Sequence, residues 1–321
     1  MAVKEIVNSL SEALDVDIHL YSGQISREGY EQLSVILRDE AAHPRAILML
    51  STVGGDPHAG YRIARALCHH YPEGFSVMIP GLCKSAGTLI CLGAKALIMG
   101  DRSELGPLDV QVRKKDELFE LGSGLDTIQA LSYMQSQAMS AFRTYLIELK
   151  ADAGLSTRMA AEISTKLATG LFSPVYSQVD PVRLGELQRS IEVAYSYGNR
   201  LSKKSSNLKS DALNRLVSRY PAHGFVIDRS EARELFENVR SPAGDELDLL
   251  NFWYDNPNND PSGQPMVINL TKLFGDEDDE QQQANVANDG PHEGDGGVDA
   301  VEQAIGEDRG NGDPVPIQDA D

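Results

Sequence analysis

Between residues 46 and 100 the chain alternates short apolar runs with helical patterns, and this alternation limits the fold more than any other feature of the sequence. The run 46–50 (AILML) leads directly into a glycine-rich turn, and the run 75–79 (FSVMI) leads into a second tight turn. A helical pattern follows each turn, and the apolar run 96–99 (ALIM) comes after the second one. The order strand, helix, strand, helix, strand predicts parallel strands joined by crossover helices, and therefore an α/β fold.

Helical patterns also dominate the chain beyond Gly124. Near residue 227 a short apolar run predicts a strand that enters a helix, where Asp228 and Glu231 have the spacing of a capping box. From Ser241 onward Pro, Asn, Asp and Gly become frequent, which predicts the exit from the fold. The stretches with helical spacing are 124–149, 157–167, 181–201 and 210–220.

The negative charge is concentrated at the end of the chain. The 321 residues include 29 Lys and Arg against 48 Asp and Glu, a formal net charge of −19. Residues 276–321 hold fifteen acidic residues and a single basic one, Arg309, so they carry −14 and leave −5 for the preceding 275. This tail has too little apolar content to offset the entropy of ordering, so we expect it to be disordered, either as a solubilising tail or as one that recruits a partner.

Several classes of protein are disfavoured. The first 23 residues carry acids where a secretory signal would need an uninterrupted apolar run, and no run of about 18 apolar residues occurs, which favours a soluble, cytoplasmic protein without a membrane span. Cys68, Cys83 and Cys91 form no C-x-x-C pair and have no histidine at ligand spacing, so neither a disulfide framework nor a zinc site is expected.

One basic cluster stands out, but it has no aromatic residues interleaved with it and matches no nucleic-acid-binding motif, so we interpret it as a solvated face and expect no nucleic-acid partner. Its members are Arg200, Lys203, Lys204 and Lys209.

The two tight turns predict the position of a site, because ligands of open α/β sheets bind at the carboxyl ends of parallel strands. The first turn contains Gly54 and Gly55, whose backbone can approach a ligand closely. The second places Ser85 just before a small-residue helix, whose first N–H groups could stabilise an oxyanion. Ser85 as nucleophile, with the amides of Gly55 and Ala86 on the oxyanion, is one hypothesis; Ser85 as a simple helix N-cap is the other.

The motifs STVGGDPHAGYRIARAL and CKSAGTLICLGAKALIMGDRSELGPLDVQ, at about residues 45–112, resemble the superfamily of the Clp protease proteolytic subunit and signal peptide peptidase A (SppA). Within it they are most similar to the serine dehydrogenase proteinase branch. The resemblance implies a ClpP/crotonase-like ββα superhelix, catalysis by Ser85, and an oxyanion hole formed by Gly54, Gly55 and Ala86. It also implies assembly into rings or other homo-oligomers. No metal or nucleotide cofactor is expected, because the sequence contains no Walker motif and no metal-ligand cluster.

The general base is less well indicated. Clp-type enzymes use a histidine some two dozen residues beyond the serine, yet no histidine lies between His70 and His223. SppA-type enzymes use a lysine farther downstream, and 123–126 (SGLD), where it would be expected, contains none. We favour Lys115, which follows the segment expected to border the cleft, although it would have to lose its proton near neutral pH. The other lysines that remain open are Lys84, Lys114 and Lys150, and Asp109 could orient a lysine.

By this resemblance residues 1–240 form a peptidase domain, with its core at about 18–170 and a helical extension at about 171–240. Residues 241–275 are expected to be an irregular linker and 276–321 a disordered acidic tail.

The sequence therefore predicts an SppA-like serine endopeptidase acting on peptides or unfolded proteins, with any ATPase or adaptor supplied in trans. Two alternatives stay open. The missing histidine favours a non-catalytic crotonase-like scaffold that binds peptides. An acyl-CoA hydratase or hydrolase would use the same oxyanion turn, but a convincing pair of catalytic carboxylates is absent from the turns.

Overall fold

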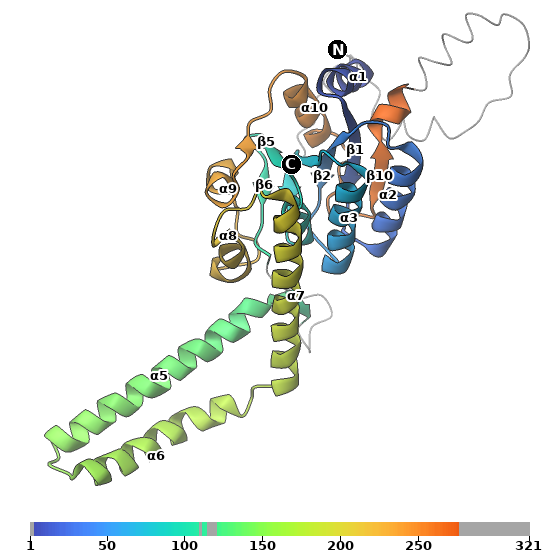
Figure 1. Cartoon of the computed structure of the whole chain (residues 1–321). Coiled ribbons are helices and arrows are strands. Elements are labelled where there is room, and N and C mark those ends of the chain that lie inside the picture. Colours follow the sequence, from blue (N-terminus) through green and yellow to red (C-terminus); the bar gives the residue numbers. More distant parts are fainter. Residues whose placement is uncertain (1–2, 109–110, 114–120, 276–321) are drawn as a thin grey trace, which may run out of the picture.

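A six-stranded sheet forms the centre of the molecule. The computed structural model describes residues 3–108, 111–113 and 121–275 (Figure 1). The strand order is β10-β1-β2-β3-β5-β9, and every neighbouring pair is parallel except β10 with β1. The predicted α/β fold is thereby confirmed. The strands are β1 (Val16–Ser22), β2 (Arg45–Ser51), β3 (Phe75–Ile79), β5 (Ala96–Met99), β9 (Val239–Arg240) and β10 (Met266–Asn269).

Helices cover both faces of this sheet, which explains why its central strands are apolar along their whole length rather than alternating. On β2, Leu48 and Leu50 belong to the core on one face, whereas Ile47 and Met49 belong to the core on the other. The first face is covered by α2 (Arg27–Glu40), α3 (Pro57–His70) and α4 (Ala86–Cys91), and the second by α1 (Val3–Leu14) and α10 (Asp245–Tyr254).

A small second sheet leaves the plane of the first at the carboxyl ends of the strands. It consists of β4 (Leu82–Cys83) and β6 (Glu104–Leu105), which are parallel. Cys83 bridges to Thr52 just beyond β2, and Leu105 bridges to Ile227. This sheet fixes the backbone immediately before Ser85.

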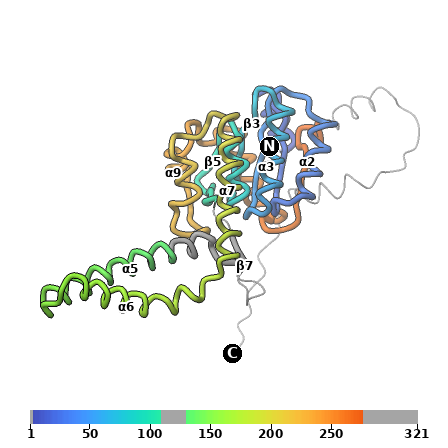
Figure 2. Tube along the Cα trace, turned by 60° about the horizontal axis from the view of Figure 1, so that its bottom comes forward, coloured from blue at the N-terminus to red at the C-terminus, as the bar shows by residue number. Residues whose placement is uncertain are grey.

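A long helical hairpin projects away from the sheet (Figures 1 and 2). It is made of α5 (Gly124–Ala151) and α6 (Thr157–Tyr176), and α7 (Pro181–Ser205) then returns beside α3 and α4. The hairpin starts from the strand pair β7 (Gln111–Arg113) and β8 (Leu121–Ser123). Apolar side chains are exposed on it, including Tyr133, Ile147, Leu167 and Leu171.

The chain after α7 differs in detail from the sequence prediction. The expected helix at 210–220 is a short α8 (Ala212–Asn214) followed by a π-helical turn (Arg215–Arg219). The strand expected before α9 (Arg229–Leu235) is reduced to the single bridge of Ile227, while the predicted cap is present, since Asp228 accepts the N–H of Glu231 at 2.8 Å.

The expectation that 241–275 is an irregular linker is wrong. Leu249, Leu250 and Trp253 of α10 are buried under the sheet, and the backbone of β10 pairs with β1. The Pro- and Asn-rich composition that suggested a linker belongs to the connection between α10 and β10. The predicted acidic tail at 276–321 lies outside the described residues. Among the helices that are described, none has the length and apolar content needed to cross a bilayer.

Candidate active site

Ser85 sits on a strained turn between β4 and α4. Its backbone angles are φ 49° and ψ −110°, a conformation that a residue with a Cβ adopts only when its surroundings enforce it. The enforcement comes from the flanking backbone, because the Lys84 N–H donates to Thr52 O at 3.0 Å and the Gly87 N–H to Lys84 O at 2.8 Å. The Ser85 hydroxyl makes no capping hydrogen bond to α4, so the N-cap interpretation does not hold here.

The turn after β2 packs so closely against its neighbours, including Ser85, that it has to be built from glycine. Gly54 and Gly55 have φ values of 110° and 144°, which disfavour any side chain. A Cβ on Gly54 would lie 2.8 Å from the Cβ of Ser85, and one on Gly55 would lie 2.2 Å from Ile25 O. Two glycines in a row are therefore a steric condition for bringing this turn beside the serine.

The two glycine amides are used differently. The Gly54 N–H donates to Thr52 Oγ1 at 3.0 Å, so it is occupied within the turn and is not the oxyanion donor that the sequence suggested. The N–H groups of Gly55 and Ala86 donate to no other part of the described chain, and both residues line the cavity beside Ser85. Ala86 opens α4, where the first N–H groups have no partner within the helix. Both amides are therefore available to a ligand in the cavity.

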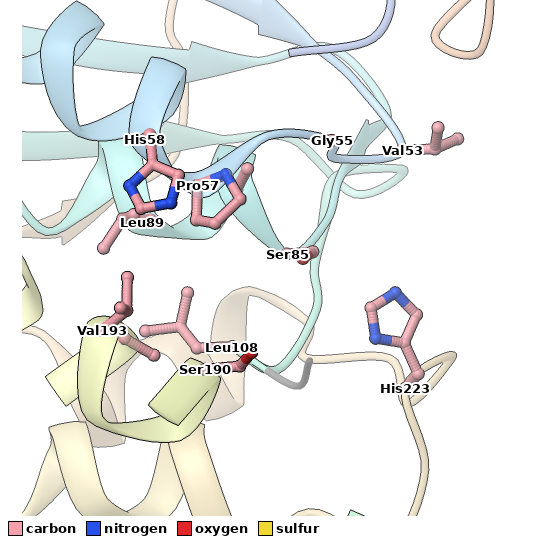
Figure 3. Close-up of a pocket in the computed structure, with 12 residues that line it drawn as sticks. Val53, Gly55, Pro57, His58, Ser85, Leu89, Leu108, Ser190, Val193 and His223 are labelled. Atoms are coloured by element: carbon pink, nitrogen blue, oxygen red, sulfur yellow. The ribbon is translucent and has the colours of Figure 1, made fainter. Parts of the chain in front are cut away.

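A cavity of about 310 Å³ lies in front of Ser85, which is itself half-buried (Figure 3). Apart from Ser85, its walls are mostly apolar, as in many ligand sites. One wall comes from the glycine turn, α3 and α4, and the opposite wall comes from α7, Leu108 and the loop that carries His223. The lining residues are Val53, Gly55, Pro57, His58, Ser85, Ala86, Leu89, Leu108, Ser190, Val193, Ala194 and His223.

His223 is the cavity residue that sequence reasoning missed. It is half-buried on the loop between the π-helical turn and α9, and its imidazole faces the cavity in Figure 3. The sequence shows only that Pro221 and Gly224 flank it, which predicts a loop but gives no partner. His223 is far from Ser85 in the sequence, but the pairing of Leu105 with Ile227 brings its loop to the cavity that Ser85 lines.

The lysines predicted as candidate bases lie elsewhere or outside the described residues. Lys84 is buried and turned away from the cavity, with its Nζ 3.1 Å from Glu104 Oε2 and donating to Leu105 O at 3.2 Å. Lys150 lies at the far end of α5, where its Nζ donates to Thr157 Oγ1. Neither is placed to take a proton from Ser85. Outside the described residues lie Lys114, Lys115 and Asp109.

The cysteines near Ser85 are packing residues. Cys83 and Cys91 are fully buried, with their sulfur atoms 3.8 Å apart, and burial raises the pKa of Cys91 well above its ordinary value. A thiol that stays protonated is a poor nucleophile. Within the described part of the chain, no group of three or more His, Cys, Asp or Glu residues is arranged to hold a metal ion.

A strained serine beside two unpaired backbone N–H groups, at the edge of a cavity, is the arrangement of hydrolases that act through an activated serine. The model of the ClpP-like SDH-type serine proteinase family matches residues 24–193, more than half of the chain, and the chain belongs to that family of serine proteinases. The predicted placement in the Clp and SppA superfamily is thereby confirmed.

Individual relatives are more distant. An uncharacterized protein of Methanocaldococcus jannaschii, MJ0137, is 39% identical over 85 residues, which cover 26% of this chain and 29% of that protein. Among solved structures, a serine mutant of the membrane-bound stomatin-specific protease 1510-N is 20% identical with a TM-score of 0.30 and covers 71% of this chain and 97% of its own. A ClpP1 mutant from Listeria monocytogenes is 17% identical with a TM-score of 0.24, and the match covers 48% of this chain and 82% of that protein.

Proposed function

We propose that this protein hydrolyses peptide bonds through an acyl-enzyme on Ser85. The observation that carries the proposal is the strained turn that holds the half-buried hydroxyl of Ser85 at the edge of the cavity, next to the N–H groups of Gly55 and Ala86. Backbone strain of this kind is retained where function requires it. The substrate class, peptides or unfolded proteins, follows from the family and the mostly apolar cavity.

The proposed reaction has two halves. Ser85 Oγ attacks the carbonyl carbon of the peptide bond while a base takes its proton, and the carbonyl oxygen becomes an oxyanion between the amides of Gly55 and Ala86. Collapse of this intermediate breaks the C–N bond, and the protonated base gives its proton to the leaving amine. Water then hydrolyses the ester on Ser85 by the reverse sequence. One oxyanion donor is typically worth about 10²–10³ in kcat.

The family resemblance implies a lysine as the base, and Lys115 is the prediction from the sequence. Since Lys115 lies outside the described residues, its role is tested by substitution. If Lys115 is the base, Lys115→Ala abolishes peptide hydrolysis in a folded protein. Full activity of Lys115→Ala would remove it from the mechanism.

The nucleophile is tested by peptide hydrolysis and by labelling with a fluorophosphonate probe. We expect Ser85→Ala to lose both, by about 10³-fold or more, because no other group supplies the attacking oxygen. Ser177→Ala is the control, because Ser177 is an exposed serine at the end of the hairpin. Equal labelling of wild type and Ser85→Ala would refute the proposal that Ser85 is the nucleophile. A wild type that binds peptides without labelling or turnover would favour a non-catalytic scaffold.

We further propose that the protein is cytoplasmic and assembles into homo-oligomers, and that unfolding of protein substrates depends on an ATPase or adaptor in trans. The exposed apolar side chains of the hairpin, such as Tyr133 and Ile147, support assembly, since large apolar groups exposed along a projection favour contact with another surface. Light scattering after size-exclusion chromatography measures the oligomeric state. A monomer at micromolar concentration would contradict this part of the proposal.

A further inference from the structure

Two histidines line the cavity, and no Lys, Asp, Glu, Cys or Tyr is among the other described lining residues. In Figure 3 they lie at opposite ends, with Ser85 between them: His58 beyond Pro57 and Leu89, and His223 on the loop that closes the other side. No described lysine shares this cavity with Ser85. The two histidines are therefore the titratable side chains to compare.

His58 is held in an aromatic cluster. Its Nδ1 is 2.8 Å from the hydroxyl of Tyr197, and the two rings meet edge to face with centroids 5.6 Å apart. Tyr197 in turn stacks on Tyr61, with centroids 4.2 Å apart. These contacts hold the imidazole of His58 against α7, at the end of the cavity away from the glycine turn. His58 is better suited to shaping the pocket than to moving a proton at Ser85.

The loop of His223 is tied to the turn of Ser85 by the residue that precedes the serine. Lys84 Nζ donates to Phe225 O at 3.4 Å and to Leu105 O at 3.2 Å. Leu105 and Ile227 exchange two backbone hydrogen bonds of 2.9 and 3.0 Å. One buried ammonium group thus joins the nucleophile's turn, β6 and the histidine's loop, which makes Lys84 a positioning residue.

The chemistry favours a histidine over a lysine. With its ordinary pKa near 6.5, about three quarters of a histidine population is neutral at pH 7, whereas about one lysine in a few thousand is. A lysine base therefore needs a large pKa shift and a histidine needs none. The sequence contains no lysine at the SppA position and no histidine at the Clp position, so the base must come from elsewhere in the chain.

We infer that His223 is a further catalytic residue, the general base of the Ser85 reaction in place of Lys115; this inference rests on the proposed function. An imidazole nitrogen of His223 accepts the proton of Ser85 Oγ, directly or through one water, as the Oγ–C bond forms. The imidazolium then gives this proton to the amine as the C–N bond breaks. In deacylation the same nitrogen takes a proton from water and returns it to Ser85 Oγ.

The test compares His223→Gly with His223→Gln by peptide hydrolysis. Both remove the base, so we expect kcat/KM to fall about 10³-fold in each. Glycine leaves space for a free imidazole, and we expect added imidazole to restore the His223→Gly rate at least tenfold, but not that of His223→Gln or Ser85→Ala. A purely structural role would not respond in this way. His69→Gln, an exposed histidine at the far end of α3, is the matched control and should keep full activity.

Three results would overturn the inference: either His223 variant retaining more than a tenth of wild-type activity, no response of His223→Gly to imidazole, or inactivity of Lys115→Ala in a folded protein. Failure of the proposed function gives a different pattern, because Ser85→Ala would then keep its hydrolysis and its probe labelling. Inactive Ser85→Ala together with active His223 variants would refute the histidine alone.

Discussion

The two walls of the cavity are held in place by different means. The wall that carries Ser85, Gly55 and Ala86 is built from turns at the ends of neighbouring strands, and main-chain hydrogen bonds such as Lys84 N–H to Thr52 O fix it. The wall that carries His223 is built from α7 and a loop. The loop joins the first wall through Lys84 Nζ and the pairing of Leu105 with Ile227, and α7 joins it by side-chain packing, as between Tyr197 and His58. Main-chain hydrogen bonds beside the sheet thus hold the first wall, whereas side chains and one loop pairing hold the second.

This difference suggests a division of labour. The first wall supplies the groups that must be rigid, the nucleophile and the oxyanion donors, because small displacements weaken electrostatic stabilisation strongly. The second wall supplies the proposed proton acceptor and part of the substrate surface, where loops more often carry specificity. Substitutions in the two walls should therefore differ in both size and kind of effect.

Apart from the Ser85 and His223 variants, the largest effect is expected in the first wall, for Gly55→Val. The new Cβ would meet Ile25 O at 2.2 Å at a backbone conformation that valine disfavours, so the turn must move and its amide with it. We expect peptide hydrolysis to fall by about 10²–10³-fold. Steady-state kinetics beside a thermal melt measure this change. Near-normal kinetics would show that the Gly55 amide does not stabilise the transition state.

A smaller effect on rate is expected when the tie between the walls is cut, as in Lys84→Met. Methionine keeps most of the volume but loses the contacts to Glu104, Leu105 and Phe225. Leaving Glu104 without its partner should destabilise the fold by about 1–3 kcal/mol, since this pair is only partly exposed. We expect a roughly tenfold loss of kcat through the misplaced loop, with probe labelling of Ser85 still measurable. Denaturant unfolding gives the stability, and an unchanged kcat would show that the two walls are independent.

Much of this layout could be predicted from the sequence. The features that could not be predicted share a physical cause or a local competing contact. The apolar runs at 46–50 and 75–79, the cap at Asp228 and the turn at Ser85 are local patterns, and each is present in the structure. The cavity position of His223 and the pairing of β10 with β1 depend on contacts between distant segments, which leave no local signal. The oxyanion role expected for Gly54 failed for a different reason, because its N–H donates to the Thr52 hydroxyl within the turn.

The next prediction concerns the stability of the sheet away from the cavity, at the buried His19, and how that stability depends on pH. His19 on β1 is fully buried with no described partner for Nδ1, and burial lowers its pKa to about 4, only partly opposed by Asp17. The unfolded chain takes up this proton near pH 6.5, so stability is present above that pH and is lost as the pH falls toward 4. We expect His19 to account for about 2–3 kcal/mol of that loss.

The measurement is denaturant unfolding at pH 7 and pH 4.5 for wild type and His19→Gln. The pH dependence of the free energy of unfolding should be weaker in His19→Gln. Equal slopes for the two proteins would refute the assignment to His19.

The smallest effect is expected in the projecting hairpin, for Gly170→Ala. A Cβ at this helical position meets nothing within 4 Å, so alanine should stabilise α6 by up to about 1 kcal/mol and leave peptide hydrolysis unchanged. A thermal melt and a kinetic assay check both points. A clear loss of activity would show that the hairpin takes part in the site.

The central claim is that Ser85 is the nucleophile, and the most direct measurement is the position of its covalent adduct. Wild-type protein treated with a fluorophosphonate is digested and its modified peptide is sequenced by mass spectrometry. The account predicts a single adduct on Ser85. An adduct on another serine of the cavity, such as Ser190, or no adduct on a protein that hydrolyses peptides, would contradict it.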